Sequence, residues 1–247
     1  MNDTPRIALV GCGYWGKNLC RNFHALHALG RVIDATESGQ IQARSIAPGI
    51  EVSSHIEDAL NDPQIHGVAL ATPAETHATL AIQAMKVGKD VFVEKPMALT
   101  LEDAERMKVV ADQTNSIFMV GHLLEYHPAV LKLRELIDSG ELGKINYVYS
   151  NRLNFGKVRT EENALWSFAP HDVAVILRLL GQSPIEVSAT GGSYLTEGLA
   201  DVTVSNMRFF DEARAHIFVS WLHPFKEQRL AVVGDKQMAI FNDVAPF

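Results

Sequence analysis

The chain has 247 residues, of which 47% are hydrophobic and 21% charged, so it can bury one large core or two ordinary ones. Its formal net charge of -7 argues against a nucleic-acid partner, because neutralising phosphates requires a basic surface. No apolar run is long enough to span a bilayer, and two cysteines are too few for a disulfide framework, so we expect a cytoplasmic protein with no membrane partner.

The first half of the chain alternates short apolar runs with helical patterns, which is typical of a parallel sheet covered by helices. The expected strands are residues 7–10, 32–34, 68–71, 91–93 and 117–120. The expected helices are residues 16–29, 56–61, 75–87 and 101–113. Gly88 is a stop signal for the third helix, and Thr100 with Asp103 has the spacing of an N-cap pair. Five strands with four crossovers predict an α/β doubly wound fold, a Rossmann domain, over residues 1–121.

The pattern changes after residue 121, where an amphipathic helix over 128–139 precedes a long strand over 145–154. A second helix is expected over 171–180, beginning at His171 and closed by Gly181. Five strand-like runs follow with short turns between them, over 185–195, 202–210, 213–221, 228–233 and 238–241. Short turns indicate hairpins. Residues 122–247 are therefore expected to form an α+β domain with a large, mainly antiparallel sheet.

A glycine motif opens the first expected helix. Gly11, Gly13 and Gly16 follow the strand over 7–10 directly, in the spacing Gly-x-Gly-x-x-Gly, with Tyr14 and Trp15 inside the motif. The first glycine permits a tight turn, the second lets the backbone approach a pyrophosphate, and the third allows close contact between helix and strand. The alternative is an ordinary glycine-rich turn, but the flanking strand and helix favour dinucleotide binding.

Asp34 ends the second expected strand, roughly eighteen positions after Gly16, near the distance at which a carboxylate binds ribose hydroxyls. Such a carboxylate repels a 2′-phosphate, and no Arg or Lys follows in residues 35–38. NAD is therefore favoured over NADP. A solvated aspartate in a turn is the alternative, and it would leave the cofactor open.

Two residues are candidates for chemistry. Lys95 lies in Glu94-Lys95-Pro96, directly after the strand over 91–93, and could donate a hydrogen bond to a substrate oxygen. His171 could accept a hydroxyl proton near neutral pH. A surface turn and a structural histidine are the respective alternatives. No cluster of His, Asp and Glu has metal-ligand spacing, so no metal is expected.

Residues 150–163 concentrate Arg, Lys and Asn just before His171. Such a cluster could hold a phosphorylated or polyhydroxylated substrate, with Arg side chains on diphosphate oxygens. The candidates for substrate contacts are Arg152, Asn154, Arg159 and Asn163, together with Lys95 and His171. A solvated loop of balanced charges is an equal alternative.

With these motifs, the whole chain resembles the Gfo/Idh/MocA oxidoreductases, which act on sugars, cyclitols and nucleotide sugars. The resemblance rests on residues 11–16, on Ala-Thr-Pro-Ala-Glu-Thr-His over 71–77, on the segment over 88–96 that ends in Glu-Lys-Pro, and on Ala-Pro-His-Asp over 169–172. It implies an NAD-dependent dehydrogenase acting on a CH–OH group. Lys95 and His171 would be its catalytic residues, and Pro96 would follow a cis bond. The implied cofactor-binding set is Gly11, Gly13, Tyr14, Trp15, Gly16, Asp34, Thr72, Pro73, His77, Glu94 and Lys95.

The stretch over 151–172 resembles a subgroup that oxidises the 3-hydroxyl of UDP-N-acetyl sugars, such as UDP-N-acetylglucosamine or its uronate, for lipopolysaccharide or other surface-glycan synthesis. Ser167 stands where the family often has an aspartate, which leaves open a dehydrogenase of a free sugar or inositol, or a non-catalytic NAD-binding regulatory protein. The resemblance also implies further chain after Phe247, so the second domain is expected to be incomplete. Relatives imply a homo-oligomer, a dimer or tetramer, formed through the second domain.

Overall fold

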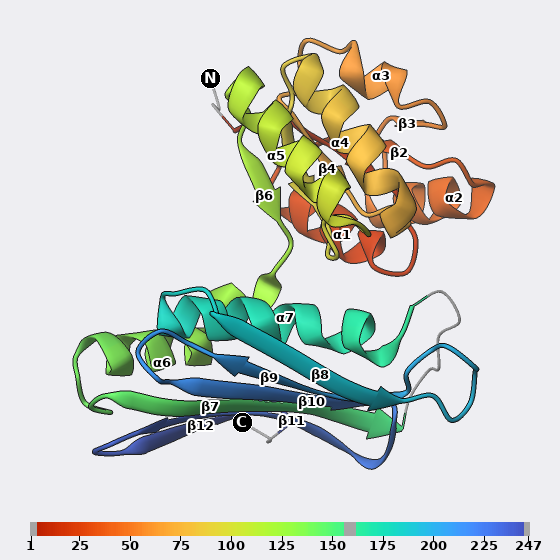
Figure 1. Ribbon diagram of the computed structural model, residues 1–247. Helices are drawn as coiled ribbons and strands as arrows, with labels where there is room; N and C mark the ends of the chain where they lie inside the picture. The colour runs from red at the N-terminus through yellow and green to blue at the C-terminus, as the bar shows by residue number, and fades with distance from the viewer. Residues whose placement is uncertain (1–3, 156–161, 245–247) are drawn as a thin grey trace. The chain divides into compact units, whose positions relative to one another are not determined.

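The computed structural model describes residues 4–155 and 162–244 (Figure 1). The chain divides into two compact units, Met1–Gly121 and His122–Phe247, which we call the first and the second domain. Each domain is built on its own six-stranded sheet. None of the helices in the described ranges combines the length and the apolarity needed to cross a membrane.

The first domain has a parallel sheet in the strand order β3-β2-β1-β4-β5-β6. Its strands are β1 (Ile7–Val10), β2 (Leu29–Ile33), β3 (Val52–Ser53), β4 (Gly67–Leu70), β5 (Asp90–Val93) and β6 (Phe118–Val120). Its helices are α1 (Gly16–Ala25), α2 (Glu37–Ile46), α3 (Glu57–Leu60), α4 (His77–Lys86) and α5 (Leu101–Thr114), with a 3-10 turn η1 over Ala74–Thr76. The expected doubly wound Rossmann fold is confirmed.

Both faces of this sheet are covered because successive residues of each strand point to opposite sides. In β1, Leu9 packs into a cluster with Leu19 and Cys20 of α1. Its neighbours Ala8 and Val10 pack into a second cluster, with residues of α3, α4 and α5. This alternation explains why β1 reads as a continuous apolar run, as strands buried on both faces do.

The structure corrects the sequence-based expectation at α1, α2 and β3. The helix expected over 16–29 ends at Ala25, because His27 takes a left-handed conformation with φ 56° and Ala28 N donates to Phe23 O. Helix α2 and strand β3 were not expected at all. Helix α2 is mostly polar, with Ile41, Ala43 and Ile46 as its apolar residues, so it has no apolar run to mark it, while β3 has only 2 residues.

The second domain has a mixed sheet in the order β12-β11-β7-β10-β9-β8, in which only the β7–β10 pair of the described strands is parallel. Its strands are β7 (Ile145–Phe155), β8 (Glu186–Gly192), β9 (Val202–Arg208), β10 (Arg214–Ser220), β11 (Leu222–Gly234) and β12 (Met238–Asn242). A 3-10 turn η2 (Leu123–Tyr126) precedes helices α6 (Pro128–Asp138) and α7 (Ala164–Leu180), which lie on one face of the sheet (Figure 1). The expected α+β architecture with a mainly antiparallel sheet is confirmed.

Helix α7 begins at Ala164, seven residues before the expected start at His171. Asn163 caps it, because its side-chain oxygen accepts a hydrogen bond from Trp166 N at 3.0 Å. Pro170, the residue before the expected start, lies inside the helix. The apolar residues Ala164, Ala169 and Val175 are buried in the domain core, and this packing holds the helix together across the proline.

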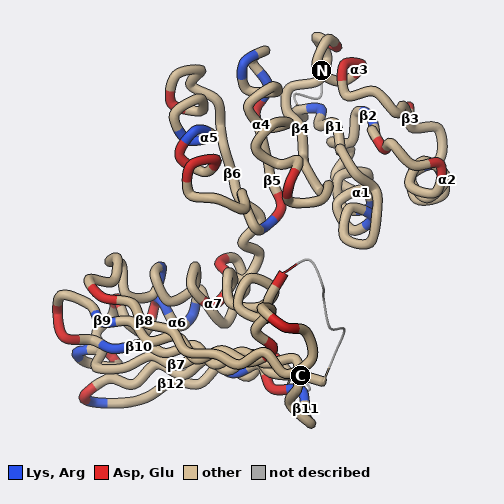
Figure 2. Tube along the Cα trace, turned by 45° about the vertical axis from the view of Figure 1, so that its right-hand side comes forward, with Lys and Arg blue, Asp and Glu red and all other residues tan. Residues whose placement is uncertain are grey.

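Several charged residues of α5 and α6 pair within their own helix. Figure 2 shows basic and acidic residues interspersed along α5 and α6. Lys108 and Asp112 form one such pair on α5 at 2.5 Å, and Lys132 and Glu135 form another on α6 at 2.6 Å. Such exposed pairs contribute little to stability, and they mark these faces as solvated.

Candidate active site

Three loops of the first domain meet at one edge of its sheet. The strand order reverses between β1 and β4, and ligands of open α/β sheets bind beyond the carboxyl ends of the strands at such a point. Val10 pairs with Leu70, and Leu70 pairs with Val93, so the three strands end level with one another. The glycine loop, the turn after β4 and the Glu-Lys-Pro segment after β5 therefore follow at the same edge.

The glycine loop fits a dinucleotide. Gly11 has φ +90°, and a Cβ there would lie 2.8 Å from Ala71 O; a Cβ on Gly16 would lie 2.0 Å from Gly11 O. These two glycines are required by the fold itself. A Cβ on Gly13 would meet no described atom within 4 Å, so the space beside its backbone is open to a phosphate.

Asp34 is buried, with 8% of its surface exposed. Its carboxylate accepts hydrogen bonds from Cys12 N at 2.6 Å and from the backbone N and hydroxyl of Thr36 at 2.8 and 2.7 Å. Asp34 is therefore not a solvated turn residue. A carboxylate has about four acceptor positions, so one remains for a ribose hydroxyl.

Sequence reasoning missed two glutamines of α2 that support this loop. Gln42 Nε2 donates to Cys12 O at 2.6 Å and to Gly13 O at 3.1 Å, and Gln40 Nε2 donates to Asp34 O at 2.9 Å. A glutamine carries no motif. The two glutamines could have been found only by first predicting helix α2, which carries them.

Trp15 connects the glycine loop to the segment that carries Lys95. Its Nε1 donates to Glu94 Oε1 at 2.6 Å, and Lys95 N donates to Glu94 Oε2 at 3.3 Å. Burial raises the pKa of the Glu94 carboxyl, although the bond from Trp15 and the nearby Lys95 and His77 charges work against this shift. The Lys95–Pro96 peptide bond is cis, as the resemblance implies. Tyr14, by contrast, is 88% exposed.

His77 lies inside the first domain, with 1% of its surface exposed. Its ring nitrogens are 2.9 Å (Nδ1) from Pro96 O and 3.0 Å (Nε2) from Thr72 O. The Thr72 hydroxyl lies 2.7 Å from that of Thr76. His77 was expected to contact the cofactor, but both of its described hydrogen bonds go to backbone carbonyls beside Lys95 and Pro73.

The second domain contains His171, within α7, whose ring meets that of His122 edge to face at 6.1 Å between centroids. The next residue, Asp172, is buried and accepts hydrogen bonds from Arg152 Nε at 2.8 Å and Nη2 at 3.1 Å, and from Ser150 Oγ at 2.7 Å. Burial alone would lower the pKa of the Arg152 guanidinium, but Asp172 and the charge of Asp243 raise it above its usual value.

The remaining expected substrate contacts have different surroundings. Asn163 is the cap of α7. Asn154 Oδ1 is buried without a hydrogen-bond partner in the described part of the chain. Arg159 lies outside the described residues. Among the residues that the structure describes, no group of three or more His, Cys, Asp or Glu is placed to hold a metal ion.

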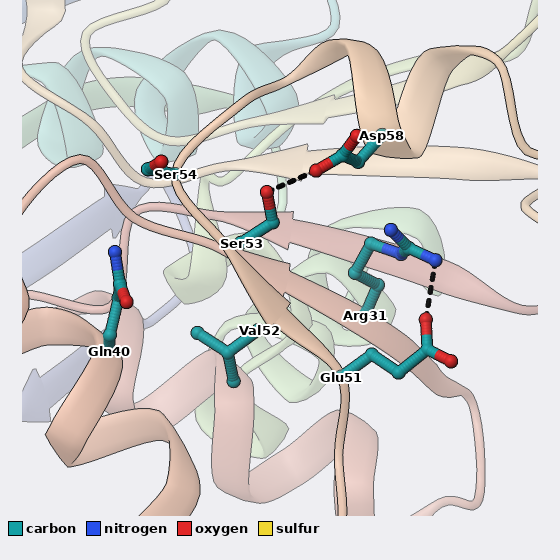
Figure 3. Close-up of a pocket in the computed structure, with 7 residues that line it drawn as sticks. All are labelled: Arg31, Gln40, Glu51, Val52, Ser53, Ser54 and Asp58. Atoms are coloured by element: carbon teal, nitrogen blue, oxygen red, sulfur yellow. Dashed lines mark hydrogen bonds and ion pairs between the residues drawn. The ribbon is translucent and has the colours of Figure 1, made fainter.

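A hollow of about 580 Å³ lies elsewhere, at the β3 edge of the first sheet (Figure 3). It is lined by Arg31, Gln40, Glu51, Val52, Ser53, Ser54 and Asp58. Arg31 and Glu51 form an ion pair in it, and Ser53 and Asp58 share a hydrogen bond (Figure 3). None of the expected site residues lines it.

Two family models match the chain. The model described as "Oxidoreductase family, NAD-binding Rossmann fold" matches residues 5–122, and the "GFO/IDH/MocA C-terminal domain" matches residues 130–240. The first domain is thus an NAD-binding Rossmann domain.

Curated relatives differ in their activities. A 2,7-anhydro-N-acetylneuraminate hydratase of Mediterraneibacter gnavus is 29% identical over 94% of this chain and 66% of its own. The scyllo-inositol 2-dehydrogenase (NAD(+)) of Bacillus subtilis is 27% identical over 98% of this chain and 74% of its own. The UDP-N-acetylglucosamine 3-dehydrogenase of Acidithiobacillus ferrooxidans is 27% identical over 78% of this chain and 59% of its own. The chain thus spans between about half and three quarters of the length of these relatives.

Solved structures share the fold along almost the whole chain. A protein of Magnetospirillum magnetotacticum MS-1 is 30% identical with a TM-score of 0.87, covering 98% of this chain and 78% of its own. GenD2 from gentamicin A biosynthesis, crystallised with NAD, is 24% identical with a TM-score of 0.88, covering 98% of this chain and 73% of its own.

Proposed function

The chain belongs to the Gfo/Idh/MocA family of oxidoreductases, and from that premise we propose that it is an NAD-dependent dehydrogenase of a sugar CH–OH group. The specific reaction we propose is oxidation of the 3-hydroxyl of a UDP-N-acetyl sugar, UDP-N-acetylglucosamine or its uronate, in the cytoplasmic synthesis of a surface glycan. The UDP-N-acetylglucosamine 3-dehydrogenase among its relatives supports this choice.

The observation that carries the proposal is the position of Lys95. It follows β5 at the same sheet edge as the glycine loop, and the Trp15–Glu94 hydrogen bond ties the two segments together. NAD would be held by the loop from Gly11 to Gly16 and by Asp34, and when bound it supplies the hydride acceptor.

Lys95 and His171 act on the substrate hydroxyl in two different roles. The Lys95 ammonium donates a hydrogen bond to the substrate oxygen and stabilises the alkoxide character that develops there. The His171 imidazole accepts the hydroxyl proton. Ser167 occupies the place of the usual aspartate, and its hydroxyl cannot act as a carboxylate toward His171.

One observation favours a second candidate, the oxidation of a free sugar or inositol. Arg152 was the expected diphosphate contact, but its guanidinium is paired with Asp172. A substrate without a diphosphate has no need of that side chain, and an inositol dehydrogenase is among the relatives.

The test is turnover by the purified protein with NAD, followed by the absorbance of the reduced cofactor. We expect turnover with UDP-N-acetylglucosamine or its uronate; turnover with only a free sugar or inositol would support the second candidate. NAD binding without turnover on a broad panel would contradict both and indicate a regulatory protein.

The matched variants are Lys95→Ala and Lys144→Ala. We expect Lys95→Ala to bind NAD within a few-fold of the wild type but to lose about 10³-fold in kcat, because a single preorganised donor contributes on that scale. Lys144 is exposed and is not among the residues assigned to the site, so its variant should turn over normally. Normal turnover by Lys95→Ala would contradict the role proposed for Lys95 in the reaction.

We further propose that the protein works as a dimer or tetramer formed through the sheet of the second domain. Helices α6 and α7 lie on one face of that sheet (Figure 1). Light scattering after size-exclusion chromatography measures the mass directly.

A further inference from the structure

His77 is a buried polar residue that the proposed chemistry does not use. It begins α4 and is 1% exposed. Its ring lies between two backbone carbonyls that are far apart in sequence, Pro96 O at 2.9 Å from Nδ1 and Thr72 O at 3.0 Å from Nε2. The first carbonyl belongs to the residue after Lys95, and the second to the turn after β4.

Both carbonyls belong to the irregular segments that follow the ends of strands. Backbone groups there have no ladder partner, and a buried carbonyl without a donor is unfavourable. A carbonyl oxygen only accepts a hydrogen bond, and a neutral imidazole donates from one ring nitrogen alone. One side chain therefore bonds both segments at once as the imidazolium, in which both ring nitrogens donate.

We propose that His77 is a positioning residue that ties the Lys95–Pro96 segment to the Thr72–Pro73 turn. The bond to Pro96 O holds the backbone that carries Lys95, and the bond to Thr72 O holds a turn on the cofactor side of the sheet edge. The inference rests on the proposed function only in the role given to Lys95. Trp15 restrains the same segment from the glycine loop through Glu94.

The two bonds can be separated by substitution. The amide nitrogen of Asn is as many bonds from Cβ as Nδ1 of His, and that of Gln is as many as Nε2. His77→Asn therefore keeps a donor for Pro96 O, and His77→Gln keeps one for Thr72 O. His77→Leu removes both donors. His24, an exposed histidine on α1, provides the matched control His24→Asn.

Two readouts need no turnover. The rate at which an amine-modifying reagent labels Lys95 in the free protein, measured by mass spectrometry against Lys144, reports the order of its segment. The dissociation constant of NAD, measured by calorimetry, reports the order of the β4 turn.

We expect His77→Gln to speed Lys95 labelling about tenfold with NAD affinity within about twofold of the wild type, on the scale of one lost hydrogen bond. His77→Asn should do the reverse, weakening NAD about tenfold at a normal labelling rate. In an active enzyme His77→Gln should lower kcat and leave the KM for NAD unchanged.

The proposal is overturned if His77→Asn and His77→Gln change both readouts equally, as a merely structural residue would, or if His77→Leu changes neither. Should His77→Leu fail to fold, the Asn and Gln variants decide the matter alone. Absence of dehydrogenase activity would remove the proposed function but leave both readouts intact, so the two failures are distinguishable.

Discussion

Gly13 and Gly16 lie in one loop, but they are glycines for different reasons. A side chain on Gly16 would collide with the carbonyl of Gly11, whereas a side chain on Gly13 would meet open space. Gly16 allows the close contact between helix α1 and strand β1, and Gly13 leaves room for the cofactor.

We predict that Gly13→Ala unfolds at the same urea concentration as the wild type but binds NAD about 100-fold more weakly, because the methyl group occupies the space of the pyrophosphate. Gly16→Ala should instead lose about 2 kcal/mol of unfolding free energy through overpacking. Urea titrations and calorimetry with NAD measure both effects. Equal NAD affinity in Gly13→Ala and the wild type would contradict the assignment of the cofactor loop.

The buried Glu94 carboxyl gives a pH-dependent prediction. Because burial raises its pKa above the ordinary 4.5, the folded protein keeps this proton to higher pH than the unfolded chain does. Its contribution to stability is therefore most favourable at low pH and falls as the pH rises above about 4.5. We expect Glu94→Gln, which keeps an acceptor for Trp15, to gain stability over the wild type as the pH rises.

Urea unfolding at pH 4.5 and pH 8 measures this difference, with the exposed Glu105→Gln as control. The difference in unfolding free energy between Glu94→Gln and the wild type should grow in favour of the variant as the pH rises. A difference that stays constant or narrows would show that burial does not raise the pKa of this carboxyl.

At the scale of the element, α7 depends on a cap that its sequence pattern does not reveal. The sequence pattern predicts the helix only from residue 171 onward. The true start needs Asn163 to bond Trp166 N and the following turns to pack into the core.

We predict that Asn163→Ala lowers the unfolding free energy by about 1 kcal/mol, while Asn163→Ser, which retains a capping oxygen, changes it by only a few tenths. Denaturant midpoints of the two variants give the comparison. If Ala and Ser were equivalent, the side chain of Asn163 would have to be assigned to something other than the helix end.

At the scale of the whole molecule, the packing of the second domain depends on contacts between elements that are distant in sequence. The Arg152–Asp172 pair joins β7 to α7, with side chains that are 15% and 5% exposed. Such a pair need not be more stable than an apolar replacement, but removing one partner leaves a buried charge.

We therefore expect Arg152→Met to lose roughly 3 kcal/mol or more, and the double variant Arg152→Met with Asp172→Leu to recover most of that loss. A double-mutant cycle in urea measures the coupling. An additive cycle would mean that the pair does not act as a unit, and would return Arg152 to the candidates for substrate contact.

The sequence by itself determined the features that depend on neighbours along the chain. Strand and helix periods, the spacing of Gly11, Gly13 and Gly16 and the segment around Lys95 were enough for the Rossmann fold, the α+β second domain, the family and NAD. These are local signals, because a turn, a phosphate loop or an amphipathic face is specified by residues within a few positions.

Only the tertiary structure decided what the far-separated residues do. It paired β7 with β10 in parallel and formed helix α2, which the sequence did not predict. It also gave Gln42, Trp15, His77 and Arg152 partners that lie 19 to 79 positions away in the chain. The spacing of residues along the chain does not predict such partners. Burial and backbone geometry determine which groups a side chain bonds, and both exist only once the sheet has formed.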